Sequence, residues 1–266
     1  NRKGGNWFYQ SAITPAHAYA WMLTSITSDD YEDLTNNGPT PDDLGNYTRF
    51  GYARLNGAFR WRNPPAREKA AYQEGDAHTE EDDKGHYIYG MKEVLYLERI
   101  ETRSHIAVFH TSERDDALGV RDENGGVDIN MRLHKLDSVQ LFTLDTYSQP
   151  NPRPIKSVHF EYDYSLAPGQ PNSIDERGKL TLRKVWFKHD LSDKGRKSPY
   201  VFHYGQNPHY EEKAVDRWGN FKGLPAHEPD NKRFPYVTQD RPVQNEQAAA
   251  WLLDSIQLPG AGAIRV

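Results

Sequence analysis

Cysteine is absent from the chain of 266 residues, and its absence excludes disulfide bonds, thiolate metal sites and cysteine nucleophiles. Long apolar runs are also missing, and none approaches the roughly 20 residues of a membrane-spanning helix. The net charge of −5 supplies no positive field, so we expect no nucleic-acid partner. The motifs of serine hydrolases, zinc proteases and P-loop proteins are absent too, and we predict no catalytic residue. We lean toward a non-enzymatic role, although a carboxylate pair that hydrolyses glycosides would leave no local signature.

Aromatic and turn-forming residues are abundant. The chain contains 16 Tyr, 10 Phe, 20 Gly and 17 Pro, while only 36% of its residues are hydrophobic. Tyrosine suits a pleated surface with one wet face, and glycine and proline supply turns. This mixture favours an all-β fold of thin, twisted sheets with little helix.

One short pattern recurs along the chain: Leu, two residues, then Ile or Val. It occupies residues 23–26, 97–100, 136–139, 182–185 and 253–256. An alternating and mostly aromatic run follows each copy, at residues 50–52, 108–110, 160–162, 202–204 and 264–266. Each pair predicts two strands of an antiparallel hairpin, with Leu and Ile or Val largely buried on one sheet face.

A single hairpin is marginally stable, so these hairpins are expected to join one larger sheet. We predict antiparallel β-hairpin repeats that form a wound sheet or shell. They would occupy one β-rich region over residues 1–266, with a subdivision near residues 120–135. The last residues, 264–266, read as the middle of a strand, and we expect the chain to be a fragment of a larger protein.

A longer internal match supports the repetition. Residues 18–26 (Ala-Tyr-Ala-Trp-Met-Leu-Thr-Ser-Ile) parallel residues 248–256 (Ala-Ala-Ala-Trp-Leu-Leu-Asp-Ser-Ile), with six of nine positions identical. The alanine-rich start is compatible with a helical turn that feeds the strand, and a short helix is expected around residues 245–253. The tryptophan would then act as an anchor.

These hairpins resemble the units of Rhs/YD-repeat proteins, in which a Leu-x-Ser-Ile strand precedes a strand ending in Phe-x-Tyr. Residues 216–223 (Asp-Arg-Trp-Gly-Asn-Phe-Lys-Gly) are similar to an Asp-x-Trp-Gly-x-Tyr segment of Rhs-like bacterial proteins. The chain as a whole looks closest to a region of very large, uncharacterised bacterial surface proteins. It departs from the family in lacking the repeated Tyr-Asp dipeptides and the aspartyl autoprotease segment.

The resemblance implies a β-ribbon wound into a shell, like the shell of toxin complexes that encloses a cargo polypeptide. The expected partners are flanking parts of the same large polypeptide and an enclosed cargo, and the expected location is extracellular or at the bacterial cell surface. An alternative interpretation is a β-sandwich that binds carbohydrate or acts on polysaccharide. Such a module would close on itself and expose coplanar aromatic side chains beside a groove.

Residues 33–43 (Asp-Leu-Thr-Asn-Asn-Gly-Pro-Thr-Pro-Asp-Asp) contain the sharpest local motif, which resembles a calcium loop. Oxygen ligands at alternate positions converge when the chain curls, and a glycine at the sixth position permits the turn. The candidate calcium ligands are Asp33, Thr35, Asn37, Asp42 and Asp43. The twelfth position of such a loop holds Leu44 here instead of an acidic residue. An Asn-Gly turn capped by an aspartate explains the same residues without a metal. No cofactor other than Ca²⁺ is expected.

Three weaker motifs have a functional and a structural interpretation each. His203 and His209 are the closest pair of possible metal ligands, and they are also compatible with histidines on a strand surface. Trp218 and Phe221 would suit a sugar-binding platform or an aromatic anchor. The basic cluster at residues 194–197 is expected to lie in a solvated hairpin turn.

Overall fold

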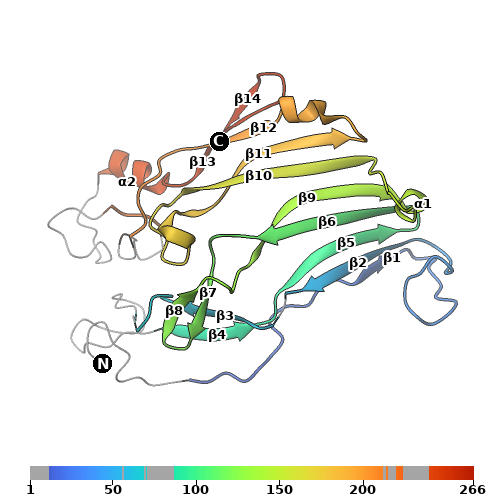
Figure 1. Cartoon of the computed structure of the whole chain (residues 1–266), viewed down its shortest axis with the longest axis horizontal. Coiled ribbons are helices and arrows are strands. Elements are labelled where there is room, and N and C mark those ends of the chain that lie inside the picture. Colours follow the sequence, from blue (N-terminus) through green and yellow to red (C-terminus); the bar gives the residue numbers. More distant parts are fainter. Residues whose placement is uncertain are drawn as a thin grey trace.

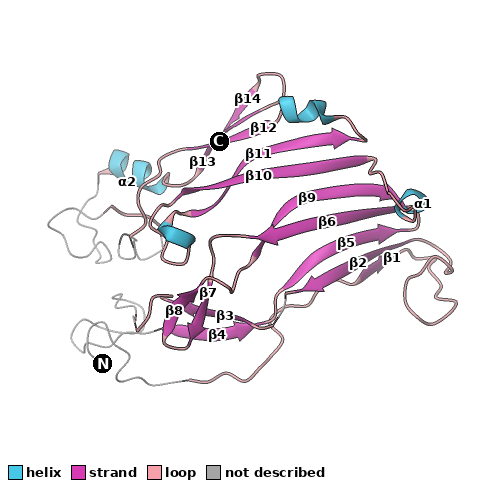
Figure 2. Cartoon of the chain, in the orientation of Figure 1, coloured by secondary structure: helices cyan, strands magenta, loops and turns pink. Residues whose placement is uncertain are grey.

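The fold is all-β in the computed structural model, which describes residues 12–55, 57–68, 70, 87–211, 214, 220–223 and 240–266. Ten strands lie side by side in one sheet, and two smaller hairpins lie near one end of it (Figure 1). Strands dominate the described chain, and the few helical turns lie at strand ends and in connections (Figure 2). The fold class predicted from composition is therefore confirmed.

The main sheet consists of β1 (Ser25–Thr27), β2 (Tyr47–Arg54), β5 (Leu95–Thr102), β6 (His105–Glu113), β9 (His134–Thr143), β10 (Lys156–Leu166), β11 (Lys179–His189), β12 (Tyr200–Tyr204), β13 (Leu253–Gln257) and β14 (Ala263–Arg265). The small hairpins are β3 (Phe59–Asn63) with β4 (Ile88–Lys92) and β7 (Gly119–Asp122) with β8 (Gly125–Asp128). The helical segments are α1 (Leu144–Tyr147), α2 (Arg241–Ala248), η2 (Ile174–Glu176) and η3 (Asp193–Lys197).

Every strand of the main sheet pairs antiparallel with its neighbours, in the order β1-β2-β5-β6-β9-β10-β11-β12-β13-β14. The five predicted hairpins are thus β1–β2, β5–β6, β9–β10, β11–β12 and β13–β14. Four of the Leu-x-x-Ile/Val segments lie wholly within strands. The first lies only half within one, since β1 begins at Ser25, two residues after Leu23.

A β-bulge recurs at four junctions between successive hairpins. In a regular strand, residues three apart point to opposite faces, so Leu and Val of the repeat would be separated. The register shifts by one residue where β10 meets β11, so that Phe160 opposes Val185 and Tyr162 opposes Leu182. The extra residue on the bulged strand returns Leu and Val to the same face.

The same shift occurs where β2 meets β5, β6 meets β9 and β12 meets β13. In β6 the residues that oppose Val139 and Leu136 are Phe109 and Thr111. The aromatic run of this unit therefore begins one residue later than residues 108–110, which the sequence predicted. The sequence pattern misplaced it because Val108 and Phe109 are both plausible strand residues and only the pairing register separates them.

At three of the four bulged junctions, a tyrosine stands between one hairpin and the next. The hydroxyls of Tyr52, Tyr162 and Tyr204 donate to the carbonyl oxygens of Leu23, Leu136 and Leu182, at 2.9, 2.8 and 2.8 Å. Leu136 and Leu182 lie in the first strand of the same hairpin, and Leu23 lies two residues before β1. The tyrosine itself stands opposite the leucine of the following hairpin. The repeat in the sequence is therefore also a repeat in the structure.

Alternation and register place the repeat residues on one surface, which we call the apolar face. Its members are Phe50, Tyr52, Leu97, Ile100, Phe109, Leu136, Val139, Phe160, Tyr162, Leu182, Val185, Phe202, Tyr204, Leu253 and Ile256. The two residues between Leu and Ile or Val are polar in every copy. At the four bulges we place both of them on the other surface, which we call the opposite face.

The prediction that the repeat leucines, isoleucines and valines are largely buried is wrong: on β5, β9, β11 and β13 all of them are half-buried. The reason is that the described elements mainly contact their neighbours in the sheet, without a second layer over the apolar face. The buried residues of the main sheet lie on the opposite face. They are Tyr47, Glu101, Ile106, Ser138, Phe142, Ser157 and Thr181.

Residues 119–128 leave the main sheet and form the β7–β8 hairpin, which packs beside β3. Phe59, Leu118 and Val120 are buried there and give this part a small core of its own. The subdivision that the sequence predicts near residues 120–135 stays a prediction. The helix expected around residues 245–253 lies earlier, at α2, because Asp240 caps its N-terminus and the backbone of Trp251 turns to a positive φ of 62°.

Candidate functional site

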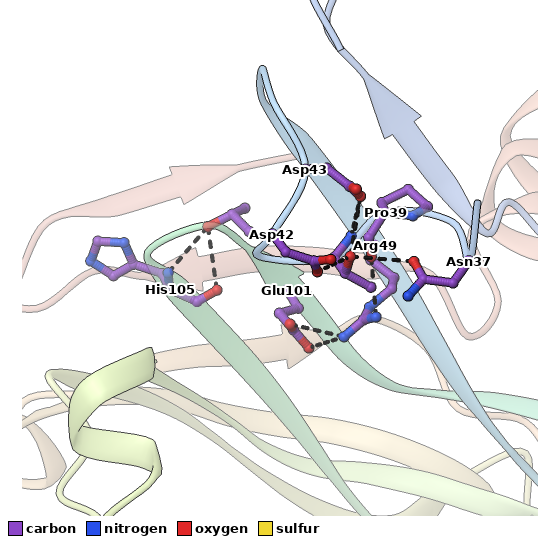
Figure 3. Close-up of polar contacts among 9 residues, drawn as sticks. Asn37, Pro39, Asp42, Asp43, Arg49, Glu101 and His105 are labelled. Atoms are coloured by element: carbon purple, nitrogen blue, oxygen red, sulfur yellow. Dashed lines mark hydrogen bonds and ion pairs between the residues drawn. The ribbon is translucent and has the colours of Figure 1, made fainter. Parts of the chain in front are cut away.

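The 33–43 loop precedes β2 and contains all five candidate calcium ligands, of which Figure 3 shows Asn37, Asp42 and Asp43. The Asp33 carboxylate accepts hydrogen bonds from the backbone N–H groups of Thr35, Asn37 and Gly38, at 3.2, 3.3 and 2.8 Å. Gly38 has a φ of +82°, as the sharp turn in the sequence motif requires. The first aspartate of the motif thus shapes the loop by capping its backbone.

Asp43 holds the other end of the loop and is 1% exposed. Its carboxylate accepts from the N–H of Leu34 at 3.1 Å, the N–H of Thr40 at 2.8 Å and the Tyr31 hydroxyl at 2.9 Å. Burial is the largest single influence on the pKa of the Asp43 carboxyl and by itself would raise it. The hydrogen bonds from Thr40, Tyr31 and Leu34 outweigh it, so the pKa lies below its usual value. Burial, the bond to Asp43 and nearby carboxylates raise the pKa of Tyr31 to about 12.

Asp42 lies beside the hydroxyl groups of the loop. The Thr40 hydroxyl donates to its carboxylate, and this bond is the main reason that the pKa of Asp42 is lowered. The Thr35 hydroxyl contributes in the same direction. Thr40 also donates to the Asn37 side chain at 3.4 Å. Asp42, Thr35 and Asn37 are therefore linked through hydroxyl hydrogen bonds.

Two arginines, one on β2 and one in the turn between β5 and β6, fix the loop, and sequence reasoning missed both. Arg49 donates to the Pro39 carbonyl at 3.2 Å and to both Glu101 oxygens at 2.9 Å (Figure 3). Arg103 donates to the carbonyls of Asp43 and Gly45. Arg49 and Glu101 are cross-strand partners in β2 and β5, so only the pairing register would have revealed them.

The geometry suits a fixed turn, and calcium binding stays a prediction. The carboxylates of Asp33 and Asp43 accept from backbone N–H donors, and two guanidinium groups donate to the carbonyl oxygens of Pro39 and Asp43. Calcium requires six to eight oxygen ligands, so these donors would have to give way to the ion. Within the ranges that the structure describes, no three histidine, aspartate or glutamate side chains are grouped in a way that would hold a metal.

A polar cluster on the opposite face went unnoticed in the sequence. Ser157 Oγ and His159 Nε2 lie 2.9 Å apart, and the His159 ring stacks on Trp186 with centroids 4.1 Å apart. Burial and the charge of Lys188 lower the pKa of His159. A hydroxyl beside a histidine is the arrangement of an activated nucleophile. Ser157 is 2% exposed, however, so a substrate has no route to its oxygen. Both residues lie on β10, and the stacking of His159 on Trp186 is the contact of this cluster that joins β10 to β11.

The weaker sequence motifs are not brought together. His203 lies on β12 opposite Ser255, whereas the His209 ring packs against Gly169 in a separate connection. Trp218 lies outside the described residues. Phe221 packs edge-on against Trp251, with ring centroids 5.0 Å apart, which is what the anchor interpretation expects.

The basic cluster at residues 194–197 forms most of η3, in the turn between β11 and β12. Arg196 lies 3.8 Å from the Glu161 carboxylate and over the Trp186 ring. It thus covers part of the opposite face.

No protein-family model, curated protein or solved structure matches the chain. In the described part, no helix has the length and apolar character needed to cross a bilayer. The features that bear on function are therefore the repeated hairpins, the two faces of the sheet and its two edges.

Proposed function

We propose that the chain is a structural wall segment of a large extracellular or cell-surface bacterial protein with an Rhs/YD-like, cargo-enclosing shell. One observation carries the proposal: a bulged hairpin repeats along a ten-stranded sheet and places its leucines and aromatic residues on one half-exposed face. A contiguous apolar surface of this kind is usually covered by a partner. A wall around a polypeptide cargo would supply that cover.

The two edges of the sheet support the same function. β1 and β14 are the outermost strands, and each is hydrogen-bonded to one neighbour only among the described residues. Exposed edge strands tend to recruit further strands. In a wall, flanking hairpins of the same polypeptide would continue the sheet on both sides.

The competing function is a β-sandwich that binds or cleaves polysaccharide. A sandwich buries the inner face of each sheet against a second sheet. The described elements form no such layer over the apolar face. This difference favours the wall over the sandwich.

The residues that flank this segment in the whole polypeptide test the proposal. A wall requires further copies of the Leu-x-x-Ile/Val strand followed by an aromatic strand on both sides. Flanking residues that form an ordinary linker and an unrelated domain would refute it.

A further inference from the structure

The duplicated nine-residue segment occurs at two places in the sheet with different surroundings. Its second copy leads into β13, which lies between β12 and β14. Its first copy leads into β1, which lies at the edge and pairs only with β2 in the described chain. The pairing of Ser25 with Arg49 corresponds to that of Ser255 with Arg265. The β1–β2 pair is thus equivalent to β13–β14, and among the described residues no strand lies beside β1 where β12 lies beside β13.

The second copy is held by β12 and the connection that follows it. Phe202 opposes Ile256 and Tyr204 opposes Leu253, with a bulge between the two pairs. The Gly205 N–H donates to the Leu252 carbonyl at 3.0 Å.

Trp251 is fastened to the same connection. Its backbone N–H donates to the Gln206 carbonyl at 2.7 Å, and its indole Nε1 donates to the Pro208 carbonyl at 2.9 Å. These carbonyls lie two and four residues after Tyr204. A tryptophan in this setting buries a large ring and satisfies its polar N–H at the same time.

The first copy exposes the corresponding side chains. Trp21 is 83% exposed, Leu23 is 52% exposed and Ile26 is 55% exposed. An apolar set of this size at an open strand edge is a site for strand addition, in which backbone hydrogen bonds give affinity and side chains give register.

We infer that the β1 edge, with Trp21, Leu23 and Ile26, docks an antiparallel Phe-x-Tyr strand from a flanking hairpin of the same polypeptide. The phenylalanine stands opposite Ile26 and the tyrosine opposite Leu23, with the bulge at residues 24–25. Trp21 donates to carbonyls two and four residues after that tyrosine. The inference rests on the proposed function in taking the sheet to be continued at this edge.

A disulfide-trapping experiment tests the register. The chain has no cysteine, so Ser25→Cys creates a unique thiol. The probe is a synthetic peptide with the sequence of residues 200–211, which contains β12 and its carbonyl-bearing connection. The matched peptide carries His203→Cys, because His203 opposes Ser255. The control peptide carries Val201→Cys, which places the thiol two residues away on the same face.

In a glutathione buffer, we expect the yield of the disulfide between the protein and the matched peptide to exceed the yield with the control peptide by about tenfold or more. Facing cysteines meet disulfide geometry only in the correct register. Trp21→Ala and Ile26→Lys should remove this preference. Leu34→Ala should keep it, because Leu34 is 54% exposed and belongs to the 33–43 loop, not to β1. Equal disulfide yields with both peptides would overturn the inference. An equal loss of the preference for the matched peptide in all three variants would overturn it as well.

The outcome is separable from that of the proposed function. A register-specific crosslink in a polypeptide without flanking hairpins would reject the wall and keep the docking edge. Flanking hairpins together with an unselective crosslink would reject the docking register and keep the wall.

Discussion

Asp43 accepts hydrogen bonds from both ends of the 33–43 loop while it is almost fully buried. Its lowered pKa means that the unfolded chain binds more protons than the folded chain at acidic pH. This carboxylate therefore stabilises the fold above pH of about 4, and its contribution is lost as pH falls below that value.

Asp43→Asn is expected to lower stability at neutral pH, because an amide cannot accept all of these hydrogen bonds. It should also flatten the loss of stability between about pH 5 and pH 3. Urea unfolding over this pH range measures both effects. An unchanged pH slope would show that Asp43 does not carry the acid sensitivity.

Asp33 allows the calcium prediction to be separated from the turn. Asp33→Ala should cost about 1–2 kcal/mol with or without calcium, because three backbone N–H groups lose their acceptor. If the loop also binds the ion, millimolar calcium raises the melting temperature of the unmodified chain and this variant loses the rise. Calorimetry that detects no heat on calcium addition would leave the loop as a turn alone.

Removing the hydroxyl of one of the three bonded tyrosines should lower the free energy of unfolding by a small amount. Tyr162→Phe keeps the ring on the apolar face and removes the bond to the Leu136 carbonyl, so it should cost about 0.5–1.5 kcal/mol. Tyr147→Phe is the matched control, since the contact of this residue with Phe142 is made by its ring. Denaturant titration of both variants compares them, and equal losses would argue against a role for the hydroxyl.

Among the elements, the bulge decides which face each residue of the repeat occupies. Asp137 is the extra residue where β9 meets β6, whereas Gln140 lies in the regular part of β9 opposite Val108. Deleting Asp137 should preserve the fold and lower the free energy of unfolding by about 1–3 kcal/mol, mainly because the hydrogen bonds of its carboxylate are lost. Deleting Gln140 shifts one half of the strand to the wrong face and should abolish cooperative unfolding.

Circular dichroism and urea unfolding distinguish the two deletions. A comparable loss of cooperative unfolding in both deletion variants would mean that the bulge is not what brings Leu136 and Val139 to one face.

The sequence predicted the hairpins well because alternation and turns are local signals. Residues 160–162 and 182–185, for example, identify β10 and β11 without any knowledge of the pairing. The bulge was not predicted, since a spacing of three between Leu182 and Val185 shows no register by itself. The same limit explains why Arg49 and Arg103 were missed as anchors of the 33–43 loop: their partners are set by strand pairing and by the path of the loop.

For the whole molecule, the sequence predicts one apolar face and leaves open what covers it. The sequence predicts that Leu182 and Leu253 are largely buried on one sheet face, and both are half-buried in a single layer. Burial depends on a second layer or a partner, and neither has a local signature in the chain. Leu182→Ala should accordingly cost about 1–2 kcal/mol, less than in a closed core.

The wall itself is tested most directly by electron cryomicroscopy of the whole natural polypeptide. We predict that the ten-stranded sheet continues beyond β1 and β14 into further hairpins and forms part of a wall, with the apolar face turned toward an enclosed cavity or cargo. A separate domain whose apolar face packs against a second sheet, with linkers leaving both edges, would contradict the proposal.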